Sequence, residues 1–259
     1  MAATSTTPAS NQTAEKLLTV LEAFADQPAA VKLSDMARQL GMNVSTLYRF
    51  TTYLIKSGYV NQLDDGRYEI SYKLCALADR VQKHQDITGT LHPYILQASR
   101  LFNESAHLAV RDDQMIVYTD NVASTAQMLT IQQHIGKTAP MYVTGIGKLF
   151  LSQLEPQALE KHIAFTGLKA YTANTCTSKE ALFREFAFIS ANGYVLDNEE
   201  CELGVRCAAV PIRNYTGKII AGISVSGPAT RLTDEAIALH IEELKARALA
   251  ASRALGFQE

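Results

Sequence analysis

Apolar residues recur every three or four positions near the start of the chain, which is the period of an α-helix. This pattern predicts an amphipathic helix from about Thr13 to Ala25. A short helix should follow, for which Ser34 is a good N-cap. Gly41 can then form a tight turn, and Asn43 can cap a second helix from Val44 to about Ser57. Two short helices joined by such a turn are typical of a helix-turn-helix.

The next segment, "GYVNQLDDGRYEI", alternates apolar and polar residues around Asp65-Gly66, a strong signal for a β-hairpin. Together these elements predict a winged helix-turn-helix over residues 13–71. On its recognition helix Leu47, Phe50 and Leu54 are spaced to face the core, so the outer face is polar. The N-terminal end of such a helix meets base edges in the major groove. The predicted DNA contacts are Ser34, Ser45, Thr46, Tyr48, Arg49, Thr52 and Arg67.

The alternative interpretation of these residues is a plain helical subdomain whose exposed Thr, Tyr and Arg side chains are only solvated surface. The ordered series of two caps, a glycine turn and a hairpin favours the winged helix-turn-helix.

A linker helix is predicted within residues 72–87. Its one apolar stripe consists of Leu74, Leu77, Ala78 and Val81. Either the chain's own domain or the same helix of a second subunit could cover this stripe. A further helix from about Thr90 to Phe102, with Pro93 in its first turn, is predicted to begin the next domain, residues 88–259.

Strands and helices alternate over the remainder of the chain. The predicted strands are "SAHLAVR" and "QMIVYTDNV", joined at Asp112-Asp113, then "QMLTIQ", "YVLDNEE", "VRCAAVPI" and "KIIAGISVS". Helices are predicted after the glycine turn at Thr144–Lys148, after a capping box at Thr177–Glu180, and from Thr233 to about Leu255. Strands in hairpins with segregated helices predict an α+β domain.

The net charge at first argues against DNA binding, because the chain has 24 Lys and Arg and 26 Asp and Glu, a net charge of −2. Between Val31 and Val60, however, four basic residues face the single acid Asp35, which gives +3. Local charge determines contact with phosphates. This basic surface is small, so we expect two or more copies to bind double-stranded DNA together, as a homodimer or homotetramer.

Composition limits the classes of protein to which the chain can belong. The hydrophobic content is 47%, and no apolar run is long enough for a membrane span. The first twelve residues are small and polar, which predicts a disordered tail and no secretory signal. The four cysteines are irregularly spaced, as expected of reduced thiols in the cytoplasm.

Two segments contain candidate binding or reactive groups. "TGIGK", Thr144 to Lys148, places helix N-terminal amides beside a loop, where a carboxylate could bind, but it lacks the spacing of a P-loop. "LDNEECELGVRC" gathers acidic residues before Cys207. The rival function is an enzyme or a zinc-binding sensor, with Cys207 as nucleophile or with Asp197, Cys207 and His107 as metal ligands. The residue types around Cys207 favour a buried, inert thiol, so we expect no cofactor and no metal.

The sequence resembles the IclR family of bacterial regulators over nearly its whole length. The resemblance rests on "VSTLYRF" with "SGYV", on "YVTGIGKLFL", and on "NGYVLDNEECELGVRCAAVPIRN" followed by "AGISVSGP". Within the family, "DNEE" with "GVRCAAVP" and "AGISVS" is most similar to the repressors that sense 2-keto-3-deoxygluconate.

The resemblance implies a winged-helix DNA-binding domain, a linker helix and a GAF-like α/β effector-binding domain, assembled as dimers or tetramers. It also implies a repressor of a sugar-acid or organic-acid catabolic operon, which a small organic acid controls. Ile146 stands where some family members have a smaller residue. The implied effector-binding residues are Met128, Ile131, Gly145, Ile146, Asp197, Val205, Cys207, Ser224 and Ser226.

Overall fold

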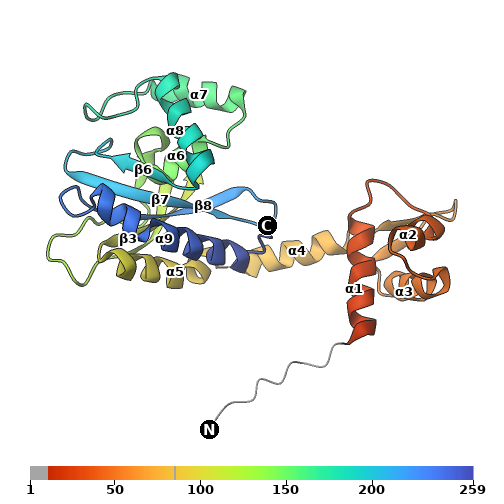
Figure 1. Ribbon diagram of the computed structural model, residues 1–259. Coiled ribbons are helices and arrows are strands. Elements are labelled where there is room, and N and C mark those ends of the chain that lie inside the picture. The colour runs from red at the N-terminus through yellow and green to blue at the C-terminus, as the bar shows by residue number, and fades with distance from the viewer. Residues whose placement is uncertain (1–10, 85, 259) are drawn as a thin grey trace, which may run out of the picture. The chain divides into compact units, whose positions relative to one another are not determined.

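The computed structural model describes residues 11–84 and 86–258, and at residues 78, 79 and 81–84 it describes the backbone only. The chain divides into two compact units, Met1–Gln85 and Asp86–Glu259 (Figure 1). Of the tail expected at 1–12, residues 1–10 lie outside the described residues. The prediction is wrong at its end, because the Asn11 side chain accepts a hydrogen bond from Ala14 N and caps a helix that begins at Gln12.

The N-terminal unit is a winged helix-turn-helix. Its elements are α1 (Gln12–Ala25), α2 (Leu33–Gln39), α3 (Val44–Lys56), β1 (Val60–Gln62), β2 (Tyr68–Ile70) and α4 (Lys73–His84). Gly41 has a φ of 61°, the left-handed conformation that the turn between α2 and α3 requires. The apolar faces of α1, α2 and α3 meet the hairpin in one core, which includes Val20, Phe24, Met36, Leu47 and Leu54.

The predicted N-cap at Ser34 is wrong. Lys32 occupies the N-cap position of α2, with extended backbone and no side-chain cap. The cause is a β-bridge, since Val31 N donates to Tyr68 O at 2.8 Å and holds the chain extended up to the helix. Ser34 is therefore an exposed residue in the first turn of α2.

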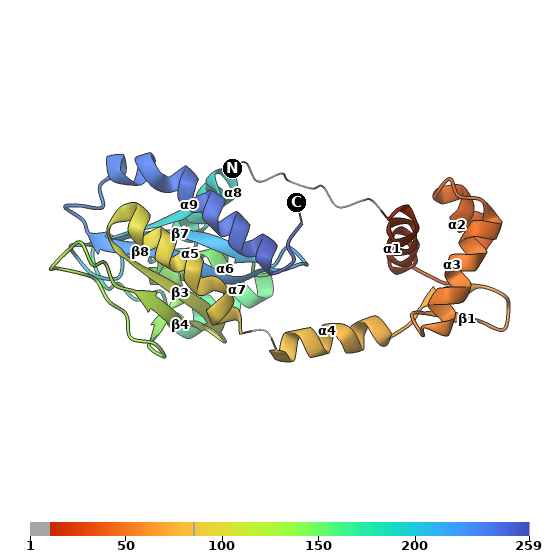
Figure 2. The ribbon, with the colours of Figure 1, turned by 90° about the horizontal axis from the view of Figure 1, so that it is seen from below.

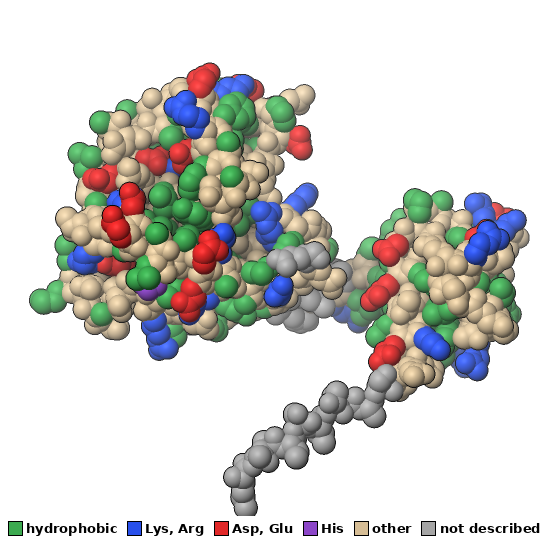
Figure 3. All heavy atoms as spheres, viewed as in Figure 1, with side chains coloured by type: hydrophobic (Ala, Val, Ile, Leu, Met, Phe, Trp, Pro, Cys, Tyr) green, Lys and Arg blue, Asp and Glu red, His purple; other side chains and the backbone are tan. Residues whose placement is uncertain are grey.

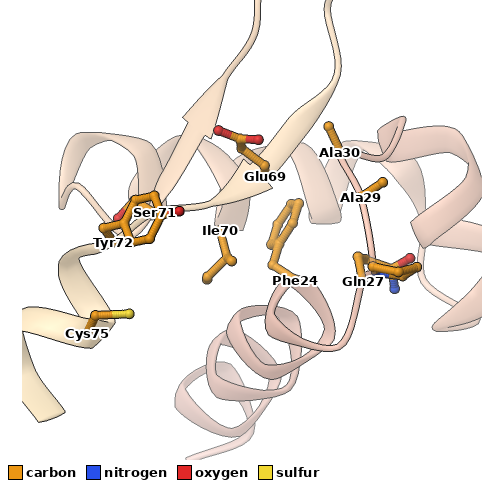
Figure 4. Close-up of a pocket in the computed structure, with 10 residues that line it drawn as sticks. Phe24, Gln27, Ala29, Ala30, Glu69, Ile70, Ser71, Tyr72 and Cys75 are labelled. Carbon is orange, nitrogen blue, oxygen red and sulfur yellow. The ribbon is translucent and has the colours of Figure 1, made fainter.

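A surface hollow of about 370 Å³ lies in this unit between the end of α1, strand β2 and the start of α4 (Figure 4). The side chains of Phe24 and Ile70 point into it, and the exposed Tyr72 stands at its side. Helix α3 contributes no residue to its lining, so the hollow is separate from the predicted DNA-reading face.

The C-terminal unit contains one antiparallel sheet of six strands in the order β5-β4-β3-β8-β7-β6. The strands are β3 (Ser105–Asp112), β4 (Met115–Val122), β5 (Thr138–Pro140), β6 (Val195–Asn198), β7 (Val205–Arg213) and β8 (Ile219–Pro228). The helices are α5 (Ile87–Phe102), α6 (Gly145–Leu151), α7 (Pro156–Thr166), α8 (Lys179–Asn192) and α9 (Asp234–Ala254), with a 3₁₀ turn at Met141–Val143 before α6. The predicted α+β fold is confirmed.

Helices cover both faces of this sheet (Figures 1 and 2). α5 and α9 pack on one face over a core that includes Leu108, Val210 and Ile223. α6, α7 and α8 pack on the other face over a second core around Ile146 and Leu149. Because side chains alternate along a strand, every central strand contributes to both faces.

The predicted third strand, "QMLTIQ", is wrong. Residues 123–137 form a loop, and the open edge of β4 is paired instead with β5. Side chains hold the loop backbone in place of a strand ladder. Asn121 Nδ2 donates to Gln133 O at 2.9 Å, and Arg231 donates to Leu129 O at 2.8 Å.

Two helix starts also differ from expectation. α5 begins at Ile87, because the Asp86 side chain accepts from Gly89 N at 3.0 Å, so Pro93 lies beyond the first turn. α8 is capped by Ser178, which accepts from Ala181 N, and not by Thr177. The cap of α9 at Thr233 is as predicted.

None of the helices in the described part of the chain has the length and apolarity needed to span a bilayer.

Candidate functional site

The exposed face of α3 presents the polar residues predicted to contact DNA. Ser45, Tyr48, Arg49 and Thr52 are exposed, and Thr46 is half-buried. Two of the hydroxyls already have local acceptors, since Ser45 Oγ donates to Asn43 Oδ1 at 2.8 Å and Thr52 Oγ1 to Tyr48 O at 2.8 Å. Tyr48 and Arg49 are therefore the long side chains of this face that are best placed to reach a groove.

Charge on this unit is unevenly distributed. Acidic side chains lie along the side formed by α1, and Lys and Arg gather on the side of α2 and α3, where the acidic Asp35 also lies (Figure 3). Arg67 forms an ion pair with Asp65 at 2.7 Å, and hydrogen bonds from the Arg67 backbone and side chain lower the pKa of Asp65. Arg38 pairs loosely with Asp35 at 3.7 Å. Within the described residues, the basic side chains on this side without a carboxylate partner are Lys32, Arg49 and Lys56.

The second candidate site is a cavity of about 50 Å³ in the C-terminal unit, between the sheet, the start of α6 and the loop 123–137. Eight of the nine residues predicted to bind an effector line it: Ile131, Gly145, Ile146, Asp197, Val205, Cys207, Ser224 and Ser226. The ninth, Met128, is fully exposed on the loop and does not line it, because the strand expected to carry it does not form.

Strand register explains why these distant residues converge. Asp197 on β6 pairs with Cys207 on β7, which pairs with Ser226 on β8, so the three side chains form one row across the sheet. Ser224 lies in the next row on the same face, opposite His107 of β3. The intervening residues of β8 turn to the α5 and α9 side.

Helix α6 closes the cavity from above the sheet. Thr144 caps this helix, accepting from Gly147 N at 3.2 Å, while the amides of Gly145 and Ile146 have no partner within the helix. Both of these residues line the cavity. Helix α6 approaches the sheet closely at its first residue, since a Cβ at Gly145 would lie 3.0 Å from the Ala209 Cβ. Amides at a helix start attract negative charge.

Burial determines the protonation of the cavity side chains. It raises the pKa of Asp197 to about 6, with the Glu200 amide opposing this shift by donating to the carboxylate at 2.8 Å. Burial raises the pKa of the Cys207 thiol well above its ordinary value, so it stays protonated. Cys207 Sγ and Ser226 Oγ are 3.0 Å apart. The cavity thus presents hydroxyl, thiol and amide hydrogen-bonding groups rather than a reactive thiolate.

Sequence reasoning missed five lining residues: Tyr118, Gln133, Thr144, Cys201 and Glu202. Thr144 had a usable signal, because it precedes the glycine turn at the position of a helix cap. The alternation predicted for the strand "SAHLAVR" likewise places the side chain of His107 on the face of that strand opposite its apolar residues. Among the described residues, no three His, Cys, Asp or Glu side chains are grouped as a metal site requires.

Comparisons with known proteins agree with this arrangement. Residues 13–64 match the IclR helix-turn-helix domain, and residues 79–253 match the bacterial transcriptional regulator IclR C-terminal domain. The Escherichia coli HTH-type transcriptional regulator XynR is 31% identical over 95% of this chain and 98% of its own length. The E. coli transcriptional repressor IclR is 31% identical over 91% and 87%.

A solved structure is similar over the same extent. The Thermotoga maritima IclR structure shares 32% identity and superimposes with a TM-score of 0.63, covering 95% of this chain and 99% of that one. The matched families and relatives are transcriptional regulators and not enzymes. With a helix-turn-helix that exposes a polar recognition face and a sheet domain that encloses a polar cavity, the chain belongs to the IclR family of DNA-binding transcriptional regulators.

Proposed function

We propose that this regulator is a repressor of a sugar-acid or organic-acid catabolic operon, and that a small carboxylate such as 2-keto-3-deoxygluconate controls its hold on the operator. The similarity to the E. coli transcriptional repressor IclR supports repression. The resemblance of "DNEE" with "GVRCAAVP" and "AGISVS" to the repressors that sense 2-keto-3-deoxygluconate supports this class of effector.

The observation that carries the proposal is the convergence of polar groups in the cavity. Gly145 and Ile146, whose amides have no partner within α6, line it together with Ser224 and Ser226. Both serines are about 95% buried, and the Ser224 hydroxyl has no hydrogen-bond partner among the described residues. Buried donors of this kind suit a ligand with a carboxylate at one end and hydroxyls at the other.

The size of the cavity limits the ligand. Its volume of about 50 Å³ is well below the roughly 300 Å³ at which ordinary ligand pockets begin. An effector of three carbons comes closest to fitting as the cavity stands, while a six-carbon sugar acid must displace the loop 123–137. Since this loop has no strand ladder of its own, its movement breaks few backbone hydrogen bonds.

We further propose that the regulator binds DNA as a homodimer or homotetramer. The basic side chains on the α2 and α3 side that lack a carboxylate partner are few, which limits the phosphate contacts that one unit can make. Two units on one duplex double these contacts. The apolar stripe of α4 is a candidate contact between subunits: Leu74 and Leu77 are half-buried, and the side chains of Ala78 and Val81 lie outside the described residues.

The proposal is tested by a thermal-shift screen of the purified protein against pyruvate, gluconate and 2-keto-3-deoxygluconate. A ligand at 100 times its Kd stabilises the folded state by about 2.7 kcal/mol, which corresponds to a rise in Tm of several degrees. A carboxylate that raises the Tm should also change the affinity for operator DNA in a gel-shift titration. Stabilisation only by stoichiometric zinc would instead support the zinc-sensor alternative.

A further inference from the structure

His107 lies directly behind the cavity, although neither the sequence patterns nor the family resemblance assigns it to the effector site. It is 1% exposed and faces the same side of the sheet as Ser224, with which it is paired in register. Its Nδ1 lies 3.3 Å from Ser226 Oγ, and its ring packs edge-on against Tyr118 at a centroid distance of 5.8 Å. Both of these neighbours line the cavity.

The other nitrogen of this ring has unused hydrogen-bonding capacity. His107 Nε2 is buried and has no hydrogen-bond partner of good geometry among the described residues, although the Ile131 backbone lies near enough to raise the pKa slightly. Burial has the larger effect and lowers the pKa of His107 to about 4. The ring is therefore neutral near pH 7 in the absence of an effector.

The charges around the cavity pose a problem for an anionic ligand. The charged side chains in its described lining are Asp197 and Glu202, and both are acidic. The nearby Lys148 does not line it, because its ammonium is engaged by Glu185, Glu200 and the Leu196 carbonyl. Burying a carboxylate beside acids without a compensating cation is unfavourable, and the partial charge of a helix start offsets this only in part.

We propose that His107 supplies the missing cation and thereby selects for carboxylate effectors. When the carboxylate binds, the ring takes up one proton from solvent. Nδ1–H then donates to Ser226 Oγ, which frees the Ser226 hydroxyl to donate to the carboxylate, and Nε2–H faces the Ile131 backbone on the loop. This inference rests on the proposed function, because it presumes that a carboxylate occupies the cavity.

The test is calorimetric titration at pH 7 with pyruvate and 2-keto-3-deoxygluconate, in two buffers of different ionisation enthalpy. Proton uptake by the wild-type protein should approach about one per site, and the association constant should then fall about tenfold for each unit of pH rise. The variant His107→Gln should bind the same ligand more weakly and without proton uptake. His134→Gln is the matched control, because His134 is exposed, and it should keep the uptake of the wild-type protein.

Other titratable groups near His107 are Tyr118 on β4, which its ring contacts, and four residues that line the same cavity: Asp197 on β6, Cys207 on β7, and Cys201 and Glu202 on the loop after β6. Burial raises the pKa of the Tyr118 phenol and of both thiols, so these groups are already protonated at pH 7. The carboxylates of Asp197 and Glu202 could take up the proton instead. Uptake that is lost in Asp197→Asn but kept in His107→Gln would overturn the proposal. Carboxylate binding to the wild-type protein with no proton uptake would also overturn it and leave the proposed function intact. Absence of carboxylate binding altogether would overturn both.

Discussion

The Lys148 ammonium lies 2.5 Å from Oε1 of Glu200, and both side chains are buried. The same ammonium also donates to Glu185 at 2.8 Å and to the Leu196 carbonyl at 2.7 Å. Burial lowers the pKa of Lys148, but the two carboxylates outweigh it, so the net shift is upward. This ion pair joins helix α6, which borders the cavity, to the segment that carries Asp197.

We predict that Lys148→Met destabilises the protein by about 3–5 kcal/mol, because removing one partner leaves buried carboxylates without compensation. The measurement is the free energy of unfolding in urea. Lys179→Met is the matched control, since Lys179 and its partner Glu160 are both largely exposed, and such pairs contribute about 0–1 kcal/mol. Equal losses in the two variants would contradict the structural role of Lys148.

Arg49→Ala should weaken operator binding by about 1–3 kcal/mol and relax specificity at one base position if the side chain reads a base. The measurement is a gel-shift titration against an operator selected from a library of random duplexes. Lys16→Ala removes the same charge from an exposed position on α1 and should have a smaller effect. Unchanged affinity in Arg49→Ala would remove this residue from the interface.

Footprinting should show two protected half-sites on one face of the duplex, related by a pseudo-palindrome. This follows from the small basic surface of each N-terminal unit, which makes binding by a pair of subunits more favourable. Protection of a single short site by a monomer would contradict the prediction.

The double variant Ser224→Ala/Ser226→Ala should keep its affinity for operator DNA and lose its response to the effector. Couplings between two sites are typically about 1–3 kcal/mol, and they are reciprocal. Operator DNA must therefore change effector affinity in the wild-type protein by the same factor that the effector changes DNA affinity. Calorimetric titration of the effector with and without operator measures this factor. Equal affinities in the two titrations would mean that the cavity does not control DNA binding.

The free energy of unfolding should decrease as the pH is lowered from about 6.5 to about 4. His162 is fully buried, and burial lowers its pKa from 6.5 to about 4, as it does for His107. The unfolded chain therefore binds protons on both histidines before the folded chain does. Asp197 opposes this below about pH 6, because its raised pKa lets the folded chain bind a proton first.

His162→Gln removes one of these histidines and should flatten the pH dependence by up to about 1.4 kcal/mol per pH unit. The free energy of unfolding in urea at pH 7, 6 and 5 measures it. His134→Gln should leave the slope as in the wild-type protein, because His134 is exposed in the folded state. A slope that His162→Gln does not change would contradict the assignment.

The helices and hairpins with local signals could be predicted from the sequence. Asn43 and Thr233 cap their helices as expected, because a side chain that bonds its own neighbouring amides needs no information from elsewhere in the chain. The cap at Ser34 failed for the opposite reason. The start of α2 is set by the bridge between Val31 and Tyr68, a contact between residues 37 positions apart.

The cavity residues also divide into those that local signals place and those that depend on pairing with distant segments. Ser224 and Ser226 could be placed on one face by strand alternation alone. Met128 could not be placed, because its exposure depends on which segment pairs with the edge of β4. His107 could be assigned to the correct face of its strand, but its proximity to Ser226 depends on the register between β3 and β8.

Strand β8 carries folding and ligand recognition on interleaved positions. Ala221, Ile223 and Val225 belong to the core under α5 and α9, while Ser224 and Ser226 border the cavity. Substitution at the cavity positions leaves the packing of the opposite face unchanged. An insertion of one residue, by contrast, would turn the core side chains that follow it toward the cavity and the cavity side chains toward the core. New ligand preferences can therefore evolve in this strand by point substitution, whereas an insertion within it disturbs the core and the cavity together.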